Sequence, residues 1–409
     1  MKFFEKGELK LLWPFYLTVL IQACLYIWPA FLVIFFNQKG LSFFQMSILF
    51  ATVNFCKLIF EIPTGAIADI FGRKFSVILG IVLESTGLIL TYFVNNFYMF
   101  ILLACLMGIS YTLGSGANEA LIVDHLHKNK RKDLVHSYFS KEVSIVGLGV
   151  ILSGLVGAVI VKHFGVGIIS LVSAVGLIAG GIILLIFVNE NFKGKYVSIS
   201  KSVSNTINYS KFSIKSSLKH PVLLFLIVSG LFFGIEGSLG GNISWQSLLV
   251  NLNFQVYWLG YLFSIAGIVL VLTPYASKYF LKLVGSEKNS LLLTYIIYFL
   301  CAVSIMLVFN WQIACLVYLS VCFFGVLSTP IEKSFFQKHT LSKYRATITS
   351  FRSLVSSTGS IIGNLVVGYL IDIIGPKMTL FYSSFLILPI IFMTLLIKDN
   401  YKKRKNTKN

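Results

Sequence analysis

Charged residues are scarce in this sequence. Aspartate, glutamate, lysine and arginine make up 12% of its 409 residues, whereas they make up about 25% of an ordinary soluble domain. Hydrophobic residues reach 56%, and the mean hydropathy is +0.85. A soluble chain of this length needs a polar surface that this composition does not supply. The sequence therefore excludes a soluble globular protein and indicates insertion into a membrane.

Motifs of enzymatic chemistry are missing as well. The sequence has no Gly-rich nucleotide loop ending in Lys-Ser or Lys-Thr, no His-x-x-x-His pair, no nucleophile elbow and no paired aspartates within an apolar block. Its six cysteines lie inside apolar blocks, without the spacing of a disulfide framework or a metal site. We therefore expect no enzymatic activity, no cofactor and no metal site.

The apolar residues fall in blocks of roughly 20, the length that crosses the hydrocarbon core of a bilayer. These blocks predict an all-α membrane protein with twelve transmembrane helices. The expected spans are residues 10–36, 43–70, 74–94, 97–125, 137–162, 166–188, 221–250, 255–282, 289–309, 311–340, 345–373 and 376–398.

The longest polar gap divides these spans into two groups of six. We expect a six-helix bundle at 1–188, a cytoplasmic linker at 189–220, a second six-helix bundle at 221–398 and a basic cytoplasmic tail at 399–409. A polar linker in this place suits two bundles that move against each other.

The net charge of +19 would indicate a nucleic-acid partner in a soluble protein. Here the basic residues lie in the short gaps between apolar blocks, so we interpret them as topology signals and expect no nucleic acid. With both termini in the cytoplasm, only Lys39, Lys162 and Lys377 lie in outside loops. This bias predicts a multi-pass protein of the cell inner membrane with both ends cytoplasmic.

A short spacing recurs along the chain. The second span ends in a Gly-x-x-x-Asp-x-x-Gly pattern at 65–72, and the eleventh ends in the same pattern at 368–375. Weaker copies close the fifth span at 158–165 and the eighth at 278–285. Each copy follows the second helix of a three-helix group, which is expected for a transporter built from inverted three-helix repeats.

The first copy continues into two basic residues, giving Gly65-Ala-Ile-Ala-Asp69-Ile-Phe-Gly72-Arg73-Lys74. Gly65 lets a neighbouring helix approach closely, and Gly72 allows a sharp turn. Asp69 can accept hydrogen bonds at the N-terminus of a facing helix. The segment resembles the signature loop between the second and third helices of the major facilitator superfamily, whose pattern is Gly-x-x-x-Asp-x-x-Gly-Arg-Lys/Arg.

The resemblance implies a secondary transporter that works by alternating access. It also implies that the loop latches the two bundles together, with Asp69 against the start of the eleventh helix and Arg73 reaching Asp124 at the end of the fourth. The alternative is that Arg73 and Lys74 act only as positive-inside anchors.

Two segments are similar to a bacterial drug-efflux-like branch of that superfamily, namely Glu61-Ile-Pro-Thr-Gly and Arg345-Ala-Thr-Ile-Thr-Ser. This similarity implies proton-coupled export of a small amphipathic or hydrophobic compound. Two departures count against antiport: Ala104 stands where antiporters usually carry an Arg, four residues before Gly108, and the fifth span lacks their Gly-Pro pair. The alternatives are uptake or facilitated export of a metabolite or siderophore, and a non-transporting membrane sensor.

Acidic residues inside the spans are costly, at roughly 2.5–3.5 kcal/mol for a charge at the bilayer centre, and so mark candidate sites. For Glu236, in a Gly-rich run where the seventh span should bend or break, we expect a substrate or proton role in preference to a structural hydrogen bond. Lys57 lies one turn from Glu61 and can neutralise it, either in the cavity or as a structural ion pair. Glu84 is expected to be a neutral, hydrogen-bonded packing acid, because family analogy places its helix at the periphery.

Further candidates come from polar and aromatic side chains. We expect a small-molecule substrate and protons as partners in the lipid bilayer, and a monomeric protein. Trp28-Pro29 should bend the first helix. Candidate cavity residues are Gln22, Tyr26, Trp245 and Gln246, and candidate cytoplasmic gate residues, beside Asp124, are Glu119, Glu142 and Arg352.

Overall fold

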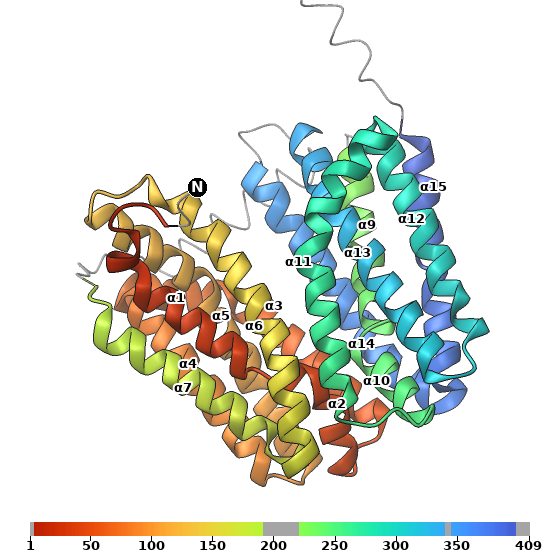
Figure 1. The fold of residues 1–409 in the computed structure, drawn as a ribbon, viewed down its shortest axis with the longest axis horizontal. Coiled ribbons are helices and arrows are strands. Elements are labelled where there is room, and N and C mark those ends of the chain that lie inside the picture. Colours follow the sequence, from red (N-terminus) through yellow and green to blue (C-terminus); the bar gives the residue numbers. More distant parts are fainter. Residues whose placement is uncertain (1–3, 191–220, 340–344, 398–409) are drawn as a thin grey trace, which may run out of the picture. The chain divides into compact units, whose positions relative to one another are not determined.

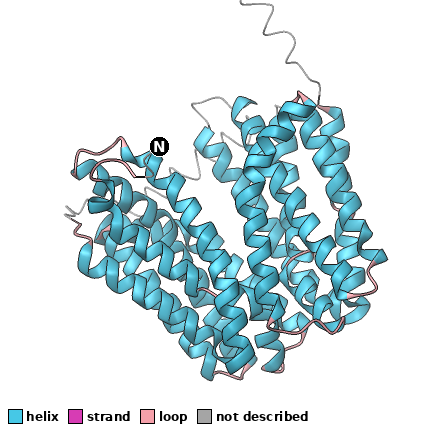
Figure 2. Ribbon diagram, in the orientation of Figure 1, coloured by secondary structure: helices cyan, strands magenta, loops and turns pink. Residues whose placement is uncertain are grey.

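The computed structural model of the protein describes residues 4–190, 221–339 and 345–397. The described residues form helices joined by short loops (Figure 2), as expected for an all-α protein. The linker expected at 189–220 lies outside the described residues from 191 onward, and the tail expected at 399–409 lies outside them entirely.

The helices follow one another along the chain as labelled in Figure 1. Those before residue 190 are α1 (Glu8–Leu25), α2 (Trp28–Gln38), α3 (Phe43–Phe71), α4 (Arg73–Phe93), α5 (Phe97–Lys128), α6 (Leu134–Phe164), the short η1 (Val166–Ile168) and α7 (Ile169–Phe187). Those after residue 220 are α9 (Pro221–Leu239), α10 (Asn242–Asn251), α11 (Trp258–Val284), α12 (Glu287–Val303), the short η2 (Ser304–Leu307), α13 (Trp311–His339), α14 (Arg345–Ser384) and α15 (Ile387–Leu396).

Ten helical stretches among the described residues are long and apolar enough to cross a membrane. The first six correspond to the first six expected spans. The stretch Phe351–Leu396 covers the eleventh and twelfth expected spans and contains a non-helical residue, Gly375, with φ 79° and ψ 164°. The seventh expected span corresponds to α9 and α10, which are not among the ten.

Two of the expected spans contain the break in the helix that the sequence predicts. The first span is interrupted between α1 and α2, where Pro29 occupies the first turn of α2, a position that needs no backbone N–H. The seventh span is broken between α9 and α10 at Gly240 and Gly241, in the Gly-rich run that contains Glu236.

The described residues fall into two compact units. The first contains the described part of Met1–Ser204 together with Leu249–Val271, and the second contains the described part of Asn205–Leu248 and of Leu272–Asn409. Leu249–Val271 joins the first unit because the start of α11 packs on α6. There Gly154 and Gly260 bring the two backbones close, and Ser264 Oγ donates to the carbonyl oxygen of Ile151 at 2.6 Å.

Within the first unit, α5 packs against α3 and α4, and α1 packs against α6 and α7 (Figure 1). The helix α4 also packs against α7. Small residues permit these contacts: a Cβ atom on Gly80 would lie 2.9 Å from the carbonyl oxygen of Ser110. Helices packed this closely hold their inward side chains in fixed places, which is what a binding site inside the unit requires.

Candidate functional site

The signature loop is built around a turn at Gly72. This residue ends α3 and precedes α4 with φ 101°, a conformation that favours glycine. The carboxylate of Glu190, just after α7, accepts hydrogen bonds from the backbone N–H of Arg73 at 3.0 Å and of Lys74 at 2.8 Å. An acidic group at a helix N-terminus satisfies free N–H groups and the helix dipole. The loop is therefore fixed to the end of α7 as well as to α3 and α4.

The guanidinium of Arg73 reaches across to α5. It donates to the carbonyl oxygen of Ala120 at 2.9 Å and forms an ion pair with Asp124, the contact that the sequence predicts. Both side chains are partly exposed, at 31% and 54%, and an exposed pair contributes at most about 1 kcal/mol to stability. The pair therefore orients the loop more than it stabilises the fold.

Lys74, Gly65 and Asp69 complete the signature loop. The Nζ of Lys74 donates to the carbonyl oxygen of Leu185 at 2.7 Å. Gly65 and Asp69 are exposed on α3. The expected partner of Asp69 is the start of α14, where residues 340–344 and the side chains of 345–348 lie outside the description. That contact stays a prediction.

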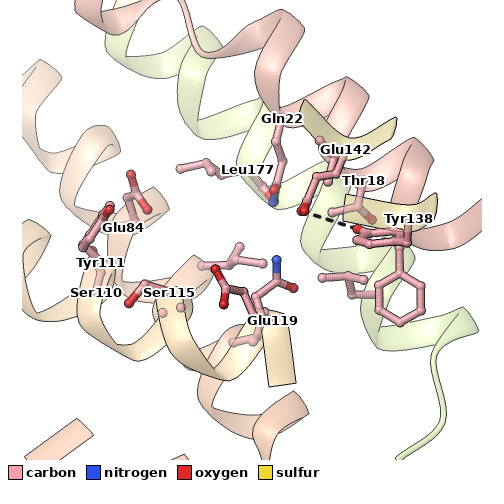
Figure 3. A pocket seen from close by; sticks show the side chains of 18 residues that line it. Thr18, Gln22, Glu84, Ser110, Tyr111, Ser115, Glu119, Tyr138, Glu142 and Leu177 are labelled. Atoms are coloured by element: carbon pink, nitrogen blue, oxygen red, sulfur yellow. Dashed lines mark hydrogen bonds between the residues drawn. The ribbon is translucent and has the colours of Figure 1, made fainter. Parts of the chain in front are cut away.

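A cavity of about 390 Å³ lies inside the first unit, between α1, α4, α5, α6 and α7 (Figure 3). Three carboxylates from different helices line it: Glu84 of α4, Glu119 of α5 and Glu142 of α6. Figure 3 shows their side chains around the same open space. None of the described residues that line the cavity is a lysine, an arginine or a histidine. The cavity wall is therefore acidic in a chain that is strongly basic.

Glu84 of α4 is hydrogen-bonded and also lines the cavity. The sequence predicts a hydrogen-bonded packing acid here, and the hydroxyl of Tyr26, directly after α1, donates to Glu84 Oε1 at 3.3 Å. Its place in the cavity lining is an addition that the sequence does not predict. The helix α4 packs against α5 and α7.

Lys57 of α3 contacts an aromatic ring of α5. Its Nζ is 3.8 Å from the ring centroid of Tyr111. The expected partner is Glu61, one turn along α3, but no ion pair joins Lys57 to Glu61 in the described part of the chain, and Glu61 is exposed. The face of the Tyr111 ring attracts the ammonium group.

The opposite part of the cavity contains the remaining candidates of the first unit. Gln22 lines the cavity, and its Nε2 donates to the carbonyl oxygen of Leu177 at 3.4 Å. Glu142 accepts a hydrogen bond from the hydroxyl of Tyr138 at 3.4 Å, and Glu119 lines the same cavity. The structure thus brings Gln22, Glu119 and Glu142 into one site, although the sequence assigned them to different groups.

The candidates of the second unit are packed in its interior. Glu236 is 7% exposed and accepts a hydrogen bond of 2.6 Å from the hydroxyl of Tyr298. This geometry matches the structural role that the sequence analysis ranks second. Trp245 and Gln246 are buried as well.

Arg352 is placed in an ion pair that the sequence does not predict. Its guanidinium lies 2.5 Å from Glu332 Oε1, and Glu332 is 7% exposed. An acidic residue inside an apolar block next to Pro330 is the signal that could have revealed Glu332.

A second buried ion pair also escapes the sequence analysis. Glu8, at the first residue of α1, is fully buried, and the Nζ of Lys141 lies 2.5 and 2.6 Å from its two carboxylate oxygens. The hydroxyl of Tyr16 donates to the same carboxylate at 2.7 Å. A charge at the edge of an apolar block normally indicates a solvated flank, so no sequence signal distinguishes Glu8.

Comparison with known proteins shows which family the chain matches. The model of the Major Facilitator Superfamily matches residues 15–363. The chain is 25% identical over 393 residues to the uncharacterized MFS-type transporter YxaM of Bacillus subtilis (strain 168), covering 92% of this chain and 93% of the relative. It is 26% identical over 235 residues to an uncharacterized transporter of Buchnera aphidicola subsp. Schizaphis graminum, covering 55% of this chain and 56% of that protein.

Solved structures share the fold. A variant of the nucleoside transporter NupG superposes with a TM-score of 0.76 at 15% identity, covering 94% of this chain and 99% of that one. A POT family transporter in complex with a thioalcohol-conjugated peptide superposes with a TM-score of 0.71 at 16% identity, covering 94% of each chain. These relatives and neighbours are transporters and not enzymes. With its signature loop, its membrane helices and this match, the chain belongs to the Major Facilitator Superfamily and is a multi-pass membrane transporter.

Proposed function

We propose that the protein is a secondary active transporter with twelve transmembrane helices in two six-helix bundles and both termini in the cytoplasm. It exports a small amphipathic or hydrophobic compound across the inner membrane in exchange for protons, by alternating access. One observation carries this proposal: a cavity of about 390 Å³ within the first unit is lined by three carboxylates from three helices. Carboxylates inside a membrane protein are the groups that exchange protons along a transport path.

The loop at 65–74 supports the gating part of the proposal. Glu190 fixes the start of α4, and Asp124 with Ala120 fixes the guanidinium of Arg73. A loop held in this way can present Asp69 to the start of α14 when the cytoplasmic side closes. Glu119, Glu142 and Arg352 belong to this cytoplasmic gate in the proposal.

Protons have several candidate carriers. Glu119 of α5 and Glu142 of α6 line the same cavity, and carboxylates inside a membrane protein can carry protons. Glu236, which accepts a hydrogen bond from Tyr298, and Glu61 on α3 are further, separate candidates. Trp245 and Gln246 lie near the break that follows Glu236. The absence of an arginine at Ala104 means that this coupling does not use the arginine of other antiporters.

The test is a proton-flux assay on the purified full chain in proteoliposomes that enclose a pH-sensitive dye. A panel of amphipathic compounds and metabolites is added in turn. The proposal predicts proton movement opposite in direction to the solute, and a loss of at least about tenfold in Glu119→Gln and Glu142→Gln but not in Glu5→Gln, whose exposed carboxylate lies outside the cavity. Proton and solute moving in the same direction would indicate uptake. Binding without solute movement would indicate a sensor, and either result overturns the proposal.

A further inference from the structure

The lining of the first-unit cavity has three kinds of side chain. Its charged groups are the carboxylates of Glu84, Glu119 and Glu142. Its aromatic and aliphatic groups include Phe15, Tyr111 and Ile81, and its neutral polar side chains are Thr18, Gln22, Ser110, Ser115 and Asn118. Apolar walls with a few convergent polar groups are typical of a site for a small organic molecule. They suit a hydrated inorganic cation poorly, because such a cation needs oxygen ligands on all sides.

One aromatic residue of the lining already contacts a cation. The ammonium of Lys57 lies 3.8 Å from the centroid of the Tyr111 ring. An aromatic face of this kind attracts ammonium groups. Lys57 comes from α3 and is not among the residues that line the cavity, whereas Tyr111 is. The Tyr111 ring is therefore in contact with a cation that is tethered to the chain outside the lining.

The part of the cavity around Glu119 and Glu142 also combines carboxylates with aromatic side chains, but none of the described residues in its lining is a lysine or an arginine. Glu119 is exposed and lines the cavity. Among the described residues, Tyr138 is the one that donates a hydrogen bond to Glu142, at 3.4 Å. No ion pair engages Glu119 or Glu142 in the described part of the chain. A positive group placed between them would meet two carboxylates and the aromatic side chains of Phe15 and Tyr138.

We propose that this cavity binds a small organic cation, with its charged nitrogen at Glu119 and Glu142 and its apolar body toward Tyr111. The inference deepens the proposed function and rests on it for one point, that the bound cation is the transported solute. A second positive group on the same ligand would compete with Lys57 for the Tyr111 ring.

The experiment measures binding to the purified full chain in detergent. The probe is a dimethylaminostyryl dye carrying an N-methylpyridinium cation, whose fluorescence rises in an apolar site. Its control is the same dye without the N-methyl group, at a pH where that pyridine is neutral. The cation should bind at least about tenfold more tightly than the neutral dye, equivalent to about 1.4 kcal/mol. Equal affinities would overturn the inference, and this comparison needs no variant.

Three variants locate the site. Glu119→Gln should weaken cation binding by about tenfold and leave neutral-dye binding unchanged. Lys57→Gln should strengthen cation binding, because it removes a positive charge that repels the bound cation and frees the Tyr111 ring for the apolar body of the ligand. Glu5→Gln, which removes an exposed carboxylate outside the cavity, should change neither. Weaker cation binding in Lys57→Gln, or full binding in Glu119→Gln, would contradict this placement.

The binding assay is separate from transport. A chain that binds the cation but moves no solute would retain this inference and overturn the proposed function. A chain that transports only neutral or anionic solutes would retain the transport function and overturn the inference.

Discussion

The role of each charged side chain in this protein depends on the partner that it contacts. The sequence shows which charges lie inside apolar blocks, but their partners belong to helices far apart along the chain. Glu190 caps α4 from a distance of more than one hundred residues, and Lys141 neutralises Glu8 from a similar distance. Such pairs depend on helix packing and not on local spacing, so sequence analysis finds the charged residue and misses its partner. Arg73 with Asp124 is the exception, because the family motif relates the two.

Arg73→Lys distinguishes the latch from a simple topology anchor. Lysine keeps the positive charge but loses the guanidinium that joins Asp124 and the carbonyl of Ala120. The latch predicts a fall in transport rate of at least about tenfold with little change in stability, because an exposed ion pair contributes at most about 1 kcal/mol. The measurement is solute flux in proteoliposomes, with the midpoint of thermal unfolding as a control. Unchanged flux would favour the anchor.

Helices are the level at which the sequence is most informative. Ten of the described stretches meet the length and hydropathy expected of membrane spans. The breaks at Pro29 and at Gly240 with Gly241 fall where the sequence predicts them, because proline and glycine act locally on the backbone. Which face of a helix turns inward is not local. The sequence therefore predicts a hydrogen-bonded acid at Glu84, as the bond from Tyr26 shows, but it does not predict that Glu84 lines the cavity.

Close packing between α3 and α5 gives a test at this scale. A Cβ atom on Gly108 would lie 2.6 Å from Cys56 Cβ and 2.7 Å from the carbonyl oxygen of Val53, so alanine there must push α3 away. Overpacking of this kind costs about 1–3 kcal/mol. We expect Gly108→Ala to lower the thermal unfolding midpoint of the purified protein.

The matched control is Gly116→Ala on the same helix. A Cβ atom there meets nothing within 4 Å, so the substitution should leave the midpoint unchanged or raise it slightly through helix propensity, by at most about 1 kcal/mol. Equal effects of the two substitutions would show that the close approach of α3 and α5 does not contribute to stability.

At the scale of the whole molecule, composition and topology signals predict a polytopic transporter, and the match to the Major Facilitator Superfamily over residues 15–363 establishes the family. The substrate is not encoded in the motif that identifies this family, because the loop at 65–74 belongs to the gate. Substrate chemistry depends instead on which side chains five separate helices bring to one cavity. That is why Gln22, Glu119 and Glu142 could be named from the sequence but not assembled into a site.

Alternating access of this cavity is the central claim, and site-directed alkylation tests it most directly. Ser115 lines the cavity and is exposed, so Ser115→Cys, in a chain whose six native cysteines are replaced, places one thiol there. A membrane-impermeant maleimide is applied to right-side-out and to inverted vesicles, with and without a transported solute. The account predicts labelling from both sides, with solute shifting the ratio between them. Labelling from one side only under every condition would contradict it.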